Sequence, residues 1–301
     1  MALTRTTIDK TAVHARAGAR HRVGLDNVMA MAFLFVATVY FLLPLYWLII
    51  SSTKTTSDLF STFGLWFSHS WNLGANLQLL FTYNDHIYVR WLANTFLYAG
   101  VSALIGTTLS AMAGYALAKF IFPGRNLIFS IVLGSILVPA TALVLPLYLL
   151  MSGVGLANTY WAVLLPSIVS PFGVYLSRIY AASSVPDDLL DAARVDGAGE
   201  FRTFATVVVR IMGPALVTIF LFQFVAVWNN YFLPLVMLSD NKLFPITVGL
   251  QTWNSSNGGG GQQFLFSLII TGALVGVIPL VVGFLFLQRY WRAGLTAGSV
   301  K

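Results

Sequence analysis

Six long apolar segments constrain this chain more than any other feature of its sequence. A helix needs about 20 apolar residues to cross the roughly 30 Å of hydrocarbon in a bilayer. Segments of that length are Val28–Ile50, Trp91–Leu117, Leu127–Leu150, Tyr160–Ile179, Pro214–Leu238 and Phe264–Leu287. Only 9% of the residues are charged, against about 25% in soluble domains. The sequence therefore predicts an all-α, polytopic membrane protein with six transmembrane helices, of which the fourth is interrupted by Pro166 and Pro171.

The basic residues predict the orientation of the chain. Lys and Arg are enriched in cytoplasmic connections, and with a cytoplasmic N-terminus they divide 14 to 3 in favour of the inner side. The inner set is Arg5, Lys10, Arg16, Arg20, Arg22, Lys119, Arg125, Arg178, Arg194, Arg202, Arg210, Arg289, Arg292 and Lys301, and the outer set is Lys54, Arg90 and Lys242. We therefore expect both termini in the cytoplasm, and we attribute the net charge of +7 to orientation rather than to nucleic-acid binding. Val28–Ile50 is longer than the apolar region of a signal peptide and is expected to remain as the first span.

The expected spans lack the groups that drive transport or catalysis inside a membrane. All ten acidic residues and all four histidines lie outside these segments or at their edges, whereas ion-coupled transporters usually need ionisable groups at membrane depth. The chain has no cysteine, and no lysine follows a glycine as a phosphate-binding loop requires. We therefore expect no catalytic residues, no bound metal and no cofactor in this chain. Uphill transport would need energy from a partner, and a secondary transporter or channel for a small polar solute is the alternative at this point.

The inner connection Arg178–Gly213 contains a segment with strong helix signals. Ser184 or Val185 is expected to cap a short helix, with Pro186 in its first turn. Asp187 and Asp188 suit the positive end of the helix dipole, and Gly197 suits a left-handed stop. Leu189, Ala192 and Ala193 share one face by their spacing. An ordinary amphipathic helix lying against the membrane explains these features as well as a docking element does. A second helix is expected from near Glu200.

Four motifs in this chain resemble those of binding-protein-dependent ABC import permeases of the carbohydrate class, in particular the second, maltose-type permease subunit. Asp191-Ala192-Ala193, Asp196-Gly197-Ala198 and Phe204 are similar to the cytoplasmic coupling loop of that family. The other three motifs are Gly155–Tyr160, Trp228–Leu235 and the tail Gly294–Lys301. Asp191 stands where the family has glutamate, and Val209-Arg210 stands where it has Leu-Pro.

The resemblance implies a subunit that forms half of a pore in the bacterial cytoplasmic membrane and works by alternating access. Its implied partners are a second permease, two cytoplasmic ATP-binding subunits that hold ATP and Mg, and an extracytoplasmic sugar-binding protein. The implied coupling residues are Asp188, Leu189, Asp191, Ala192, Ala193, Asp196, Gly197, Ala198 and Phe204. The resemblance does not identify the sugar.

Polar and aromatic residues near the fifth expected span are candidates for a sugar pathway, since sugars bind by ring stacking and by amide hydrogen bonds. These residues are Gln223, Trp228, Asn229, Asn230 and Tyr231, with Asn94 and Tyr98 in the second span. The alternative is that they make hydrogen bonds between helices and form an interfacial aromatic belt.

The chain is expected to divide into a basic N-terminus (1–27), a first span with an outer loop (28–90), a transmembrane core (91–288) and a cytoplasmic tail (289–301). The outer loop is expected to fold. The outer segment that contains Gly258 to Gly261 is expected to be an adaptable connector or a contact for the binding protein.

Overall fold

The computed structural model describes residues 25–257 and 265–296, and these residues form helices without strands. They belong to two units that divide between Trp47 and Leu48, and each is described by itself. The basic residues before position 25, the four consecutive glycines and the last five residues of the tail lie outside the described residues.

The first unit is formed by α1 (Leu25–Ser52), whose last five residues belong to the second unit. Its side chains between Val28 and Trp47 are almost all exposed within this chain, including Phe33 and Phe41. An apolar helix without polar neighbours is stable where lipid is the solvent, because its backbone groups are satisfied internally. This helix matches the first expected span.

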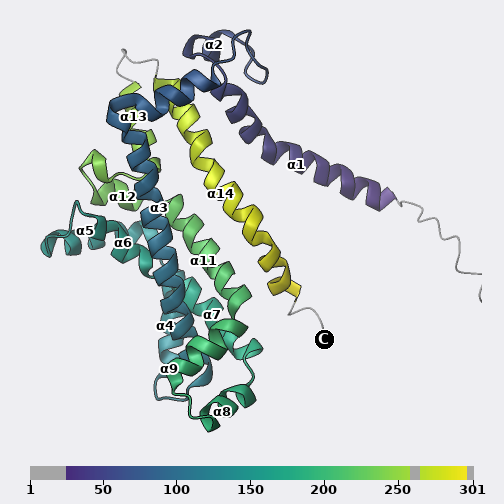
Figure 1. The fold of residues 1–301 in the computed structure, drawn as a ribbon, viewed down its shortest axis with the longest axis vertical. Helices are drawn as coiled ribbons and strands as arrows, with labels where there is room; N and C mark the ends of the chain where they lie inside the picture. The colour runs from purple at the N-terminus through teal and green to yellow at the C-terminus, as the bar shows by residue number, and fades with distance from the viewer. Residues whose placement is uncertain (1–24, 258–264, 297–301) are drawn as a thin grey trace, which may run out of the picture. The chain divides into compact units, whose positions relative to one another are not determined.

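The second unit contains the other helices. They are α2 (Thr56–Ser61), α3 (Leu73–Lys119), α4 (Arg125–Ile136), η3 (Ala140–Leu143), α5 (Val144–Gly153), α6 (Tyr160–Ile168), α7 (Pro171–Ser184), α8 (Asp187–Val195), α9 (Glu200–Thr203), η4 (Phe204–Val208), α10 (Val209–Ile211), α11 (Gly213–Trp228), α12 (Phe232–Met237), η5 (Asn241–Leu243), α13 (Ile246–Asn257) and α14 (Leu265–Thr296). Figure 1 shows α8 and α9 at one end of this unit and α2 and α13 at the opposite end, with α3 running between them.

The described residues include four helical segments that are long and apolar enough to span a membrane: 27–52, 73–119, 160–184 and 265–288. The segment 160–184 consists of α6 and α7. Two further pairs pass the same test but are bent, so six spans result if each bent pair counts as one. The all-helical, multi-span fold predicted from the sequence is thereby confirmed.

The third and fifth expected spans begin and end within a few residues of the expected bounds, but each is broken into two helices that the sequence analysis did not predict. The third is bent by 98° between α4 and the helix that begins at Ala140, because Pro139 has no N–H for a continuing helix. The fifth ends as a helix at Trp228 and resumes at Phe232. Pro234 favours this break, because its ring would clash with the carbonyl of Asn230 in a continuous helix.

A row of small residues lets α3 and α7 approach closely. Gly106, Ser110 and Gly114 recur at four-residue spacing on α3. A Cβ added to Gly114 would lie 2.6 Å from the Arg178 nitrogen, and one added to Gly173 would lie 2.6 Å from the Ser110 Oγ. Small residues at this spacing are a known means of packing membrane helices at short distance. This contact fixes α7, and with it the start of the inner connection, against the longest helix.

Candidate functional site

The inner helix α8 begins and ends where local chemistry requires it. Pro186 is the N-cap in an extended conformation, so the predicted caps Ser184 and Val185 are wrong by one or two positions. The fixed φ of proline suits this place, and its missing N–H is not needed there. At the other end Gly197 has φ +77°. Its N–H donates to the Arg194 carbonyl (3.0 Å), while Ala198 N–H donates to the Ala193 carbonyl (2.9 Å). These two bonds form a Schellman motif.

One face of α8 is fixed against the ends of the membrane helices. Leu190 is 2% exposed and packs in a cluster with Tyr115 of α3 and Val208, among others. Phe204 belongs to the same cluster, and its ring lies 5.7 Å from that of Tyr115. The structure therefore places Phe204 beneath α8, away from the exposed residues of the predicted coupling set.

The opposite face of α8 is open. The predicted residues Asp188, Leu189, Asp191, Ala192, Asp196 and Gly197 are exposed, and Ala193 and Ala198 are half-buried. Two further apolar side chains at this end are exposed: Val195 (87%) and Phe201 (74%). The sequence reasoning missed both, although an apolar residue just before a helix-ending Asp-Gly is a readable signal. The result is a surface with apolar side chains and carboxylates, which suits a partner with an apolar groove and basic groups.

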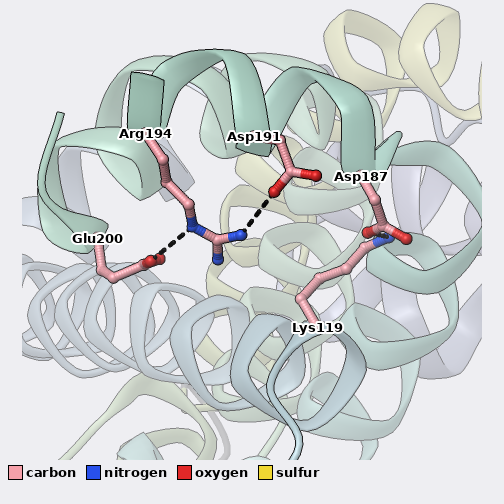
Figure 2. A network of polar contacts seen from close by, with 5 residues as sticks. All are labelled: Lys119, Asp187, Asp191, Arg194 and Glu200. Carbon is pink, nitrogen blue, oxygen red and sulfur yellow. Dashed lines mark hydrogen bonds and ion pairs between the residues drawn. The ribbon is translucent and has the colours of Figure 1, made fainter. Parts of the chain in front are cut away.

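Ion pairs tie the inner helices to each other and to the membrane core (Figure 2). Lys119 Nζ at the end of α3 lies 2.8 Å from Asp187 Oδ1 at the start of α8. Arg194 donates from Nη1 to Asp191 (2.9 Å) and from Nε to Glu200 at the start of α9 (3.0 Å). The bonds to Glu200 and Asp191 raise the pKa of the Arg194 guanidinium above its ordinary value. Arg194 thus joins α8 to α9, and Lys119 joins α8 to α3.

The Lys119–Asp187 pair gives a testable contribution to stability. Asp187→Asn is expected to lower the free energy of unfolding by about 0.5–1 kcal/mol, as for other pairs with an exposed partner. The effect should shrink in about 1 M salt, where the Debye length is roughly 3 Å. The matched control is Asp188→Asn, because this neighbouring carboxylate has no ion pair among the described residues. Thermal midpoints at low and high salt measure both, and equal shifts for the two variants would contradict the assignment.

Val209-Arg210 lies in a helical stretch that ends at a sharp turn into the membrane. Glu200–Ile211 is helical through η4 and α10, and it meets Gly213–Trp228 at an angle of 83°. The turn into the membrane lies at Met212 and Gly213, directly before Pro214. The second inner helix begins at Glu200, as predicted.

Gln223, one of the predicted pathway residues, provides hydrogen bonds to backbone carbonyls at the break between α6 and α7. Its Nε2 donates to the carbonyls of Ser167 (3.0 Å) and Ile168 (3.2 Å) at the end of α6, and to Ser102 on α3 (3.1 Å). The Ser167 carbonyl would bond to residue 171 in a continuous helix, and Pro171 has no N–H. A buried carbonyl without a partner is costly, so the amide of Gln223 stabilises the break between α6 and α7.

Asn94 and Tyr98 hold an outer turn against α3. Asn94 Nδ2 donates to the carbonyls of Lys242 (2.8 Å) and Phe244 (3.0 Å), and Tyr98 donates to Leu243 (3.0 Å). Thr95, a further polar candidate of the second span, and Trp91, which was not predicted, complete the contact: Thr95 Oγ1 accepts from Ile246 N–H, and Trp91 Nε1 donates to the Asn241 carbonyl. The four positions 91, 94, 95 and 98 follow helical spacing, which is the sequence signal for this shared face.

The remaining pathway candidates differ from one another in exposure. Trp228 is buried, and its indole donates to the Gly276 carbonyl of α14 (3.2 Å). Asn229 is exposed and bonds to its own helix at Val225. Asn230 Oδ1 accepts from Leu233 N–H (3.3 Å) in the first turn of α12, while Tyr231, the N-cap residue of that helix, is half-buried. Four of the seven candidates thus make contacts between elements: Gln223, Trp228, Asn94 and Tyr98. The other three, Asn229, Asn230 and Tyr231, lie in the break between α11 and α12.

Among residues 25–257 and 265–296, no three His, Asp or Glu side chains form a group that could hold a metal ion. Five charged groups of the inner end, Lys119, Asp187, Asp191, Arg194 and Glu200, form the ion pairs of Figure 2.

Comparison with known proteins places this arrangement in a family. Residues 106–292 match the family described as binding-protein-dependent transport system inner membrane component. The chain is 36% identical to the arabinooligosaccharides transport system permease protein AraQ of Halalkalibacterium halodurans, covering 92% of this chain and 97% of that protein. It is 30% identical to the lactose transport system permease protein LacG of Rhizobium radiobacter, with the same coverage of 92% and 97%.

A solved structure has the same fold. It is that of a bacterial ABC transporter involved in the import of the acidic polysaccharide alginate, with a TM-score of 0.76 and 21% identity. The match covers 88% of this chain and 96% of that one.

Proposed function

We propose that this chain, which belongs to the binding-protein-dependent transport system inner membrane component family and is a permease subunit of an ABC importer, forms half of the pore of a carbohydrate importer. A second permease forms the other half, and a sugar-binding protein delivers the substrate from outside. The carbohydrate class is supported by the relatives, whose names refer to arabinooligosaccharides and lactose.

The open face of α8 is the observation on which the coupling role rests. Its carboxylates and its apolar side chains Leu189 and Val195 are exposed, while the other face is fixed to the core through Leu190. A partner bound there can move the helix and the core together. We assign this partner as a cytoplasmic ATPase subunit, one of two, which binds ATP and Mg. In this assignment the permease itself carries out no catalysis.

The orientation follows from the same assignment. The α8 end of the second unit faces the cytoplasm, both termini are cytoplasmic, and the end with α2 and α13 faces outward (Figure 1). The division of basic residues, 14 to 3, supports this orientation.

Uptake by the assembled importer in liposomes tests the function. Transport of a labelled oligosaccharide is expected to require the ATPase subunits, the binding protein and internal ATP, and to stop with vanadate. Uptake that persists without ATP, or that follows an imposed ion gradient, would favour the secondary transporter or channel and reject the importer.

The broken segment after α11 yields a test of the sugar pathway. Asn229→Ala is expected to reduce the uptake rate several-fold with an unchanged thermal midpoint, because the side chain is exposed and bonds only to its own turn among the described contacts. Asn230→Ala is expected to lower stability by about 1 kcal/mol through the lost hydrogen bond to Leu233 N–H. Asn230→Asp is the control that keeps the accepting oxygen. If Asn229→Ala and Asn230→Ala both keep normal uptake affinity and rate, these residues do not line the pathway.

A further inference from the structure

Residues 53–72, between α1 and α3, form a closed loop. The Asn72 N–H donates to the Thr53 carbonyl (2.8 Å), which joins the two ends of the loop. Asn76 of α3 donates to the carbonyls of Ser52 (2.8 Å) and Lys54 (2.9 Å). A compact loop whose ends meet in this way holds its shape without a strand or a long helix.

The interior of this loop is polar. Lys54 is 1% exposed, and its ammonium donates to Thr62 Oγ1 (2.9 Å) and to the Phe63 carbonyl (2.8 Å). Asp58 is half-exposed and accepts from Ser70 (2.8 Å), and this bond, with others in the loop, holds the pKa of the Asp58 carboxyl below its usual value. These are the only Lys, Arg, Asp or Glu residues between positions 53 and 72. Both formal charges are thus bonded within the loop.

The exterior of the loop carries five aromatic rings beside the exposed polar residues Ser57, Ser61, His69 and Ser70. Its exposed rings are Phe60 (69%), Phe63 (73%), Trp66 (65%), Phe67 (43%) and Trp71 (67%). A loop in water has the reverse arrangement, with apolar groups inside and charges outside. An exposed apolar patch of this kind indicates a partner surface.

The position of the loop identifies that partner. The loop follows directly on Ser52, where the membrane helix α1 ends, so the chain places it at the boundary between hydrocarbon and water. It is also fixed to the outer end of α14, because Phe60 packs on Phe266 (5.3 Å between ring centroids) and Thr56 contacts Ser267 (3.4 Å). Trp is enriched at membrane interfaces, and polar groups near lipid must be satisfied internally. This loop meets both conditions.

We propose that residues 53–72 form an interfacial anchor whose aromatic side, Phe60, Phe63, Trp66, Phe67 and Trp71, inserts among the lipid headgroups of the outer leaflet. The charge of Lys54 is buried inside the loop and that of Asp58 is bonded to Ser70, so neither is left without a hydrogen-bond partner when the aromatic side inserts. The anchor fixes the outer ends of α1, α3 and α14 at one depth. The choice of the outer leaflet rests on the proposed orientation, which the division of basic residues supports, and the inference does not depend on the solute.

Spin labels measure the depth of the loop directly. The chain has no cysteine, so Trp66→Cys and Trp71→Cys each add one labelling site to the importer in nanodiscs of phosphatidylethanolamine and phosphatidylglycerol. The importer without an added cysteine gives the background. Asn254→Cys on α13 is the matched control, an exposed polar site at the same end of the unit. A label at Phe63→Cys leaves both tryptophans in place, should their loss disturb the loop.

The expected result is that labels at 63, 66 and 71 collide several-fold more with oxygen than with a water-soluble nickel complex, whereas the label at 254 shows the reverse. Equal access of the nickel complex to all four sites would overturn the proposal. Protection that appears only after the sugar-binding protein is added would also overturn it, because the aromatic side would then be a protein contact. Failed sugar uptake with lipid-protected labels would count against the transport assignment alone.

Discussion

Gly197→Val is expected to abolish coupled uptake while leaving the chain inserted in the membrane. Gly197 has φ +77° and forms the end of α8. A non-glycine residue pays about 1–2 kcal/mol in this conformation, and a β-branched residue is a clear outlier there. Because nothing lies within 4 Å of an added Cβ, the effect arises from backbone strain alone. A cost of about 2 kcal/mol reduces the population of the correct helix end roughly thirtyfold.

The readouts are sugar uptake, ATP hydrolysis and membrane abundance, measured on the same preparations. Gly197→Val should keep its abundance, lose uptake and no longer link hydrolysis to the loaded binding protein. Gly197→Asn is the matched control, because asparagine tolerates the left-handed region, and it should retain most of the uptake. Normal coupled uptake in the valine variant would remove α8 from the coupling role.

Gly106→Ala is expected to destabilise the chain strongly, although it adds only one methyl group. A Cβ at this position would lie 2.5 Å from the Ile168 carbonyl oxygen and closer still to the Gln223 amide nitrogen. The methyl group would therefore push away the amide that satisfies the break between α6 and α7. Overpacking together with loss of these hydrogen bonds is expected to cost on the order of 3 kcal/mol.

The control for Gly106→Ala lies on the same helix. An added Cβ at Gly100 meets nothing within 4 Å, so Gly100→Ala should be neutral or slightly stabilising, since alanine favours helix. The thermal midpoint in lipid distinguishes the two variants. Equal midpoints would show that Gly106 is not packed closely against Gln223 and the end of α6.

The inner helix could be predicted from the sequence because its determinants are local. Pro186, Asp187, Asp188 and Gly197 act within one or two turns, and the structure has the helix at the expected place. Only the cap differs from the prediction, by one or two residues. The all-helical class followed from composition and segment length, which depend on the solvent and not on tertiary contacts.

The helix breaks and the pathway residues could not be predicted in the same way. Asn94 and Gln223 bond to carbonyls 148 and 121 residues away, and no periodicity reveals a partner at that separation. Whether a buried amide lines a path or satisfies a broken helix depends on those partners. The bend at Pro139 is local, but proline within a membrane helix is often tolerated, so its presence alone does not predict a 98° bend.

At the inner end of the second unit, α8, the stretch Glu200–Ile211 and α11 are connected in series, with a sharp turn before α11. Arg194 joins α8 to Glu200. The helical stretch from Glu200 to Ile211 then meets α11 at an angle of 83°. Met212 lies at the turn between them; it is 1% exposed and packs in the cluster that contains Tyr115. Because the two helical segments meet at an angle, a displacement of Glu200–Ile211 about Met212 changes the direction of α11. A displacement of α8 by a few ångströms would therefore reach the far end of α11, at Trp228 and Asn229, as a sideways movement.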